Sequence, residues 1–211
     1  MKLHNYFRSS ASWRVRIGLA LKGLGYDYVS IHLQKNEQFG EGFAAHQASQ
    51  LVPALELDDG RWLSQSLAIL EYLEEVHPEP PLLPRDAGAR AQVRALAQDI
   101  ACDIHPINNL RVLRYLKGSM GHSQDDIDRW YRHWVATGLA VVEQRLSKTA
   151  GVFCFGDTPG LADCLLVPQV YNAQRFECPL HAYPTVQRVN AACLALQAFA
   201  STHPDACPDA A

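Results

Sequence analysis

Residues 2–25, KLHNYFRSSASWRVRIGLALKGLG, carry the signals that decide how the first part of the chain folds. Lys2–Phe7 alternates polar and apolar residues, which predicts a strand. Over 13–22 apolar residues recur at helical spacing, and the pattern stops at Gly23 and Gly25, which predicts a helix that ends at glycine. The serines between the two patterns are typical N-caps, so a strand is expected to pass directly into a helix.

The same alternation of strands and helices continues through the first eighty residues. The predicted elements are a strand over 28–33, a short helix over 38–46, a strand over 52–57, a turn at 58–60, a return strand at 62–63 and a helix over 66–76. Their order is β-α-β, a connector, then β-β-α. The proline-rich stretch 78–84 continues neither pattern, so we predict a domain boundary there.

Everything after this boundary has the apolar spacing of helices. The predicted helices cover 89–116, 123–146, 161–174 and 184–200. The sequence therefore predicts an α/β domain over 1–78, a linker over 79–86 and an all-helical bundle over 87–211. The Pro, Asp and Ala residues after Ser201 have little apolar surface to bury, and this end is expected to fray.

Composition and charge exclude several classes of function. The chain has 211 residues with 19 Lys and Arg against 22 Asp and Glu, a net charge of -3, which argues against a nucleic-acid partner. No apolar stretch approaches the ~20 residues of a membrane span, and no secretory signal is expected. The six cysteines and nine histidines show no metal-ligand spacing, so reduced thiols, a cytoplasmic protein and no metal are predicted.

The first 22 residues nevertheless contain five basic side chains and no acid. One interpretation is a transit peptide, which has this Arg- and Ser-bearing, acid-poor composition. The other is a folded segment that concentrates positive charge where an anion binds.

A cluster of polar residues, RSSASWRVR over 8–16, lies where the predicted strand meets the predicted helix. A helix N-terminus offers free N–H groups and partial positive charge, which suit an anion or a thiolate. The simpler interpretation is that one of the serines only caps the helix. The more specific one is that a serine hydroxyl donates a hydrogen bond to a thiolate, lowers its pKa and holds it as a nucleophile.

The run FRSSASWRVRIGLALKG over 7–23 closely resembles the first helix of the zeta-class glutathione transferases, the family of maleylacetoacetate and maleylpyruvate isomerases. The resemblance continues in VPALELDDG, SQSLAILEYLEE, PINNLRVL and GLADCLLVPQVYNAQRF, and it is greatest to the bacterial maleylpyruvate isomerases. It implies a thioredoxin-like glutathione-binding domain, an all-helical substrate domain, glutathione as cofactor and a homodimer. Two departures are Ala11, where the family commonly has cysteine, and Gly160, at the first position of a capping box that ends at Asp163.

The resemblance also implies which residues form the site. Because Ala11 supplies no thiol, Ser9 is expected to be the catalytic partner of the thiolate. The other expected glutathione-binding residues are Ser10, Gln38, Val52, Gln65, Ser66, His105 and Asn109. His105 and Asn109 are four apart, on one face of a predicted helix. Pro53 is expected to be cis in the family, although an ordinary trans proline would also open a strand.

Arg8, Arg111 and Arg175 are the expected substrate-binding residues, because guanidinium binds a carboxylate in a bidentate manner. The implied reaction is glutathione-dependent isomerisation of maleylpyruvate to fumarylpyruvate, a small dicarboxylate, in aromatic catabolism. The alternatives are isomerisation of maleylacetoacetate in tyrosine and homogentisate breakdown, conjugation by a general glutathione transferase, and a non-catalytic module. Arg14, Arg16 and the two lysines of the basic stretch are expected to serve a general or surface role.

Overall fold

The computed structural model describes residues 1–210, which fall into two compact units. Unit 1 contains Met1–Leu82 together with the segment that begins at Leu194, and unit 2 contains Leu83–Cys193. The last segment was predicted to belong to the helical domain. It packs with unit 1 instead, because side chains such as that of Phe199 are fully buried there.

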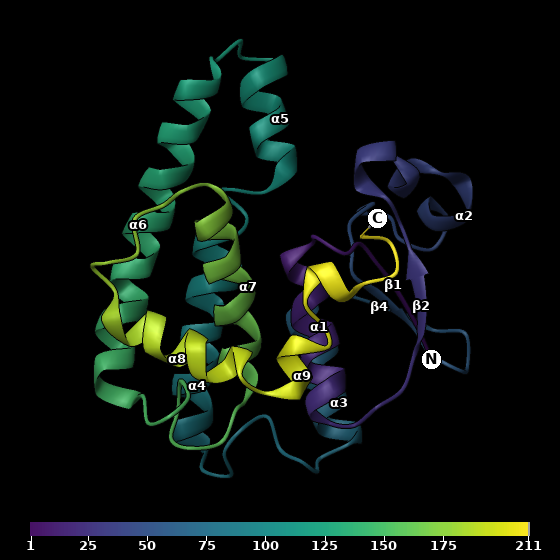
Figure 1. Cartoon of the computed structure of the whole chain (residues 1–211). Coiled ribbons are helices and arrows are strands. Elements are labelled where there is room, and N and C mark those ends of the chain that lie inside the picture. The colour runs from purple at the N-terminus through teal and green to yellow at the C-terminus, as the bar shows by residue number, and fades with distance from the viewer. Residues whose placement is uncertain (211) are drawn as a thin grey trace. The chain divides into compact units, whose positions relative to one another are not determined.

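Unit 1 is built on a four-stranded mixed sheet (Figure 1). The strands are β1 (Lys2–Asn5), β2 (Asp27–Ser30), β3 (Ala54–Glu56) and β4 (Trp62–Ser64), in the order β2-β1-β3-β4. The central strand β1 runs parallel to β2 and antiparallel to β3. All four strands lie where the sequence predicts them, so the β-α-β then β-β-α order of a thioredoxin-like domain is confirmed.

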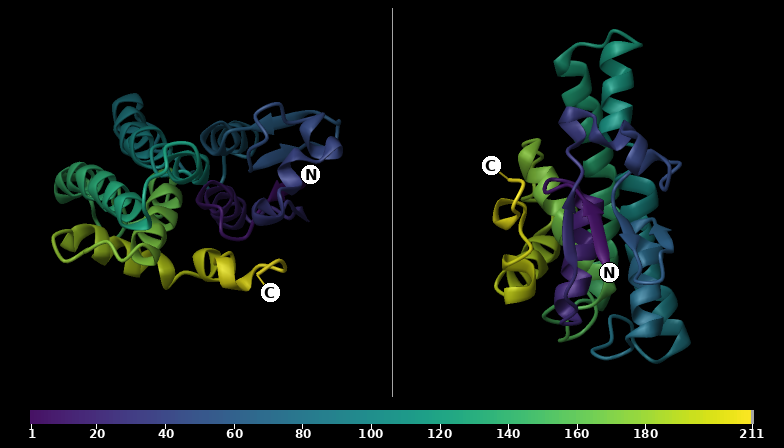
Figure 2. Two further views of the ribbon diagram at one scale, coloured as in Figure 1. Left: turned by 90° about the horizontal axis from the view of Figure 1, so that it is seen from above. Right: turned by 90° about the vertical axis from the view of Figure 1, so that its right-hand side faces the viewer.

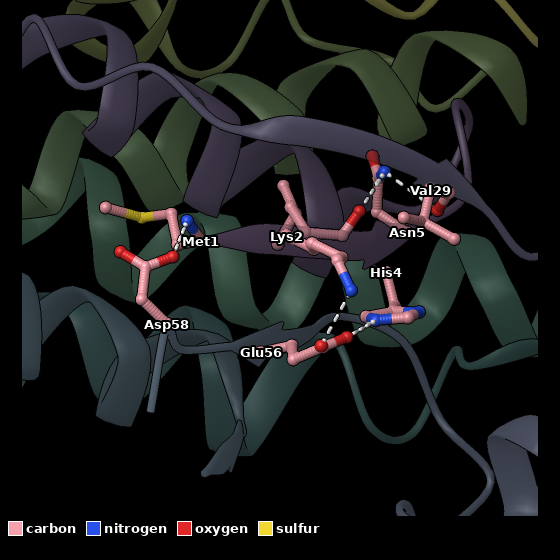
Figure 3. A network of polar contacts seen from close by, with 8 residues as sticks. Met1, Lys2, His4, Asn5, Val29, Glu56 and Asp58 are labelled. Atoms are coloured by element: carbon pink, nitrogen blue, oxygen red, sulfur yellow. Dashed lines mark hydrogen bonds and ion pairs between the residues drawn. The ribbon is translucent and has the colours of Figure 1, made fainter. Parts of the chain in front are cut away.

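The two faces of this sheet carry different side chains, as the two-residue period of a strand requires. One face packs on α1 (Ser10–Leu21) and α3 (Ser66–Val76) through a core that includes Leu3 and Leu55. On the other face Glu56 accepts hydrogen bonds from Lys2, at 2.8 Å, and from His4, at 3.0 Å (Figure 3).

The predicted short helix at 38–46 is present as two short turns, η2 (Glu37–Phe39) and α2 (Glu41–Ala44), which follow a separate turn, η1 (Leu33–Lys35). Phe43 anchors these turns in a second apolar cluster with Tyr6 and Val52. The cluster brings the end of β1 and the start of the β3 segment to the same place in unit 1.

The C-terminal segment follows α1 rather than fraying (Figure 2). It contains α9 (Gln197–Ala200) and η4 (Pro204–Ala206). Trp13 donates a hydrogen bond to Thr202 Oγ1 at 3.1 Å, and Thr202, Pro204 and Cys207 are buried. The expectation that the chain frays after Ser201 is therefore wrong, because these few side chains find buried sites along the first helix.

Three of the basic residues at the N-terminus are buried, which corrects the surface role expected for them. Arg14 is 2% exposed, Arg16 1% and Lys22 6%. Arg16 donates to Asn5 Oδ1 and to the Phe7 carbonyl, both at 2.9 Å. Buried charges are tolerated when they are paired or hydrogen-bonded in this way. Helix α1 is consequently buried around most of its circumference.

Unit 2 is helical. Its elements are α4 (Ala87–Gln98), a π-helix η3 (Asp99–Ile104), α5 (Leu110–Gly118), α6 (Gln124–Thr149), α7 (Leu161–Arg175) and α8 (Pro184–Leu194). The predicted helix over 89–116 is interrupted at 105–109, where Pro106 has no N–H to donate. The predicted helix over 184–200 is divided into α8 and α9. No helix formed by residues 1–210 is long and apolar enough to cross a membrane.

The N-terminus of α7 shows how the chain manages without a side-chain cap at Gly160. The Asp163 carboxylate accepts hydrogen bonds from the Gly160 N–H at 2.8 Å and the Cys154 N–H at 2.9 Å. Burial raises the pKa of Asp163 above its usual value. Asp163 thus serves the helix end and the preceding loop together, and the glycine departs from the family pattern without leaving this end uncapped.

Candidate functional site

Ser9 caps α1 at the point where β1 passes into the helix. Its Oγ accepts a hydrogen bond from the Ser12 N–H at 3.2 Å, and its own N–H donates to the Tyr6 carbonyl at 3.0 Å. The first turn of α1 contains no acidic residue. A hydroxyl that accepts one bond still has its proton to donate. The capping role and the thiolate-binding role predicted for Ser9 are therefore compatible in one geometry.

Arg8 is held beside this cap by aromatic side chains. Its Nη2 donates to the Tyr6 hydroxyl at 3.1 Å, and its guanidinium lies 5.0 Å from the centre of the Phe7 ring. Among residues 1–210 no carboxylate forms an ion pair with Arg8. Aromatic faces attract the cation without neutralising it. The full charge of Arg8 thus remains at the N-terminus of α1.

A second helix N-terminus in unit 1 carries Gln65 and Ser66. Gln65 has a φ of +69°, which is uncommon for a residue other than glycine and often marks a functional position. Ser66 is buried, and its Oγ accepts a hydrogen bond from Arg14 Nη1 at 3.3 Å. The first turn of α3 also contains no acidic residue. This end of α3, with a buried guanidinium beneath it, suits an anionic group.

Ser10, Val52 and Gln38 complete the predicted residues of unit 1, and Ser10 is buried in the first turn of α1. The Val52–Pro53 peptide bond is cis, as the resemblance implied. Gln38 is 5% exposed, and within the described residues its Oε1 has no hydrogen-bond partner. A buried amide oxygen without a partner is costly. A ligand N–H would satisfy this oxygen.

Three of the predicted residues of unit 2, His105, Asn109 and Arg111, lie around the break between η3 and α5. Asn109 caps α5 by accepting the Arg111 N–H at 3.1 Å, and its amide nitrogen lies 3.4 Å from His105 Nε2. His105 and Asn109 were predicted on one helix face. They do come together, but in the turn after a π-helix, an element that often occurs at functional sites.

Arg175 ends α7 and is exposed. Its guanidinium lies 5.9 Å from the ring centres of Tyr171 and Phe176. In the described part of the chain neither Arg175 nor Arg111 has a carboxylate partner. Like Arg8, each of these two arginines therefore carries a positive charge that no carboxylate among the described residues of its own unit neutralises.

Sequence reasoning missed the residues that hold the site residues in position. Arg14 links the first turns of α1 and α3, and Tyr6 positions Arg8. A signal for Arg14 was present: it alternates with Trp13 and Val15 in a stretch where every second residue is large and apolar. Such a pattern indicates a helix that is buried on more than one side.

A groove of about 270 Å³ lies between η3 and α6 in unit 2. None of the predicted site residues lines it. Its lining residues are Asp99, Cys102, Asp103, Ile107, Trp134, Thr137, Gly138 and Val141. We therefore assign it no part in the candidate site.

Comparison with known proteins adds independent evidence. Residues 8–76 match the family model described as the N-terminal domain of glutathione S-transferase. A probable maleylacetoacetate isomerase of Vibrio cholerae is 48% identical over 99% of this chain and 97% of its own length. The holo structure of a maleylpyruvate isomerase, described as a bacterial glutathione S-transferase of the zeta class, superposes with a TM-score of 0.97 at 48% identity, covering 100% of both chains.

A third relative has been solved with ligands. The maleylacetoacetate isomerase of Anaeromyxobacter dehalogenans, with bound dicarboxyethyl glutathione and citrate in its active site, has a TM-score of 0.90 at 50% identity, covering 100% of this chain and 97% of that one. Identity of this degree over the full length, together with the serine-capped first helix, leaves no ambiguity about descent. The chain belongs to the glutathione S-transferase family, in the zeta class of the maleylpyruvate and maleylacetoacetate isomerases.

Proposed function

We propose that this chain is a glutathione-dependent cis–trans isomerase that converts maleylpyruvate to fumarylpyruvate, with maleylacetoacetate as the alternative substrate. One observation carries the proposal: the acid-free N-terminus of α1, where the Ser9 cap is followed by no carboxylate and preceded by Arg8, which forms no ion pair within residues 1–210. A thiolate and a dianionic substrate both require such a site. The names of the two 48% identical relatives support either substrate.

The residues of unit 1 fit glutathione as the cofactor. The tripeptide has two carboxylates and a thiol, and unit 1 offers two helix N-termini without acids. We assign Ser9 and Ser10 to the thiol and Gln65 and Ser66 to the γ-glutamyl carboxylate. The buried Gln38 Oε1 supports a ligand N–H at that position. Further glutathione contacts are assigned to Val52, His105 and Asn109.

Ser9 is the proposed catalytic residue. Its Oγ already accepts the Ser12 N–H, so its proton is left to donate to a thiolate. This bond and the positive end of α1 stabilise the ionised form and lower the thiol pKa from the ordinary ~8.5. When bound, glutathione supplies a thiolate that adds reversibly to the conjugated cis double bond and is expelled when the trans double bond forms, so it is not consumed.

The proposed substrate residues are Arg8, Arg111 and Arg175. The substrate carries two carboxylates, and each can accept two parallel hydrogen bonds from one planar guanidinium. As the double bond becomes a single bond, negative charge develops on the substrate oxygen, and a fixed guanidinium stabilises this charge. Rotation about the former double bond then needs no proton transfer by the protein.

An ultraviolet assay with both substrates, each with and without glutathione, tests the proposal. We expect turnover only when glutathione is present, with no glutathione consumed over many turnovers. Isomerisation that continues at the same rate without glutathione would rule out this mechanism. Stoichiometric loss of glutathione would instead indicate a conjugating transferase.

We also propose that the protein is a cytoplasmic homodimer that acts in the breakdown of aromatic compounds. The six cysteines, all within the described residues, are free thiols, which supports a reducing compartment. The dimer is proposed from the family resemblance. Sedimentation of the purified protein tests it, since a monomer at micromolar concentration would contradict it.

A further inference from the structure

The carboxylate of Asp209, near the end of the C-terminal segment, accepts hydrogen bonds from two distant parts of unit 1. Its Oδ2 accepts from the Phe7 N–H at 3.2 Å and from the Ser30 hydroxyl at 3.0 Å. Its Oδ1 accepts a hydrogen bond from the Tyr28 hydroxyl. The carboxylate therefore connects β2 to the turn between β1 and α1.

The peptide groups on both sides of Phe7 are fixed by charged side chains. The Phe7 carbonyl accepts from Arg16 at 2.9 Å, and its N–H donates to Asp209. The Phe7 ring in turn lies 5.0 Å from the guanidinium of Arg8, the next residue. Hydrogen bonds to charged groups are about twice as strong as neutral ones. The orientation of Phe7, and with it of Arg8, thus depends on Arg16 and on a carboxylate about 200 residues away in the chain.

We infer that Asp209 is a positioning residue for the isomerisation, acting through Phe7 on the substrate-binding Arg8. The inference rests on the proposed function, because it takes Arg8 as a substrate ligand. Burial and the bond to Asp209 raise the pKa of Tyr28 well above its usual value, so this phenol keeps its proton and remains a donor. Tyr28 therefore holds the carboxylate in place across the working pH range.

A purely structural role for Asp209 would be to fasten the C-terminal segment. That segment has other anchors, however: Thr202 receives the Trp13 and Arg16 bonds, and Cys207 is buried. Removing the Asp209 carboxylate leaves these anchors intact. Its loss should therefore act on Arg8 more than on the stability of the segment.

The test compares Asp209→Ala with Asp205→Ala, a control in the same segment whose side chain is 80% exposed. At saturating glutathione we expect Asp209→Ala to raise KM for maleylpyruvate about fivefold, the effect of losing the one hydrogen bond that acts on Arg8 through Phe7, with kcat changed less than about twofold. Asp205→Ala should match the wild type. An unchanged KM for Asp209→Ala, or a loss confined to kcat and Tm, would overturn the inference.

Amide hydrogen exchange tests the same contact without any substrate. In Asp209→Ala the Phe7 amide is expected to exchange at least fivefold faster than in the wild type, and in Asp205→Ala at the wild-type rate. Failure of the wild type to isomerise either substrate would reject the proposed function alone. Equal Phe7 exchange in the wild type and Asp209→Ala would reject the positioning contact, whichever reaction the protein catalyses.

Discussion

Helices α1 and α6 begin with the same kind of cap but differ in the third residue after it. Ser9 in α1 and Ser123 in α6 each accept the N–H of the residue three positions on, at 3.2 Å in both. In α6 that third residue is Asp126, whose carboxylate accepts from the Ser123 N–H at 3.2 Å and from its hydroxyl at 2.6 Å. In α1 the third residue is Ser12, which brings no charge.

These two caps show how the end of a helix can become a binding site. The positive end of α6 is neutralised by the protein's own carboxylate, and the Ser123 proton is used. The end of α1 keeps its dipole uncompensated, its serine proton available and a cationic neighbour in Arg8. In a cap that serves stability alone, the protein's own groups use the serine proton and neutralise the helix end. In a cap that binds an anion, the serine proton and the positive helix end remain for the ligand.

Removal of each serine hydroxyl should separate the two caps most strongly. Ser9→Ala should lower kcat/KM about 100-fold, because the thiolate loses a preorganised donor. Ser123→Ala should keep wild-type kinetics and lower Tm by about 2–4 °C, the cost of a lost cap in a chain of this size. Steady-state kinetics and thermal unfolding of both variants make the comparison. An unchanged kcat/KM in Ser9→Ala would show that Ser9 is not the catalytic residue.

Replacing the basic residue near each cap should have the next strongest effect. Arg8→Met should raise KM for maleylpyruvate about tenfold by removing a bidentate carboxylate contact. Arg175→Met is expected to act in the same direction. Arg129→Met is the matched control, since Arg129 pairs with Asp126 on the first turn of α6. Substrate titrations at saturating glutathione measure KM, and an unchanged value for Arg8→Met would contradict its assignment to a carboxylate.

Introducing a carboxylate into the first turn of α1 should make it resemble α6. Ala11→Asp is expected to weaken glutathione binding about fivefold, because the new negative charge compensates the positive end of the helix dipole and repels the thiolate. Ala11→Asn, of the same size and without charge, is the control. Isothermal titration with glutathione compares the two. Equal affinity in both variants would show that the dipole of α1 contributes nothing to the site.

The weakest effect is expected in the pH dependence of the α6 cap. Hydrogen bonds from Ser123, followed by Arg129, lower the pKa of Asp126 to about 2, from 3.8. A carboxyl with a depressed folded-state pKa stabilises the protein above its unfolded pKa and loses that contribution as pH falls through the folded value. Asp126→Asn should therefore lower Tm by about 1–2 °C at pH 6.

This difference between Asp126→Asn and the wild type should shrink as the pH falls from 4 toward 2. Thermal unfolding of both proteins in a series of acidic buffers measures it. A difference that stays constant down to the lowest pH would show that the Asp126 charge does not stabilise α6.

The first helix shows how far sequence reasoning reached. The strand before it, its serine cap and the glycine after its last turn follow from local patterns. The resemblance to the family predicted the roles of Ser9 and Gln65 and the cis bond at Pro53. Local patterns failed where partners come from far along the chain. Arg14 and Arg16 were expected to serve a general or surface role and are buried, because their hydroxyl and carbonyl partners, Ser66 and Thr202, lie far along the chain.

Local sequence was enough to establish the order of elements, the absence of acids around Ser9 and the family to which the chain belongs. Each of these depends on neighbouring residues or on motifs read directly. The folded chain was needed to show that the segment after Ser201 packs on α1, that His105 and Asn109 meet in a turn, and that Asp209 binds Phe7. A hydrogen bond between residues about 200 positions apart leaves no periodic trace in the chain, because it depends on how the elements between them fold.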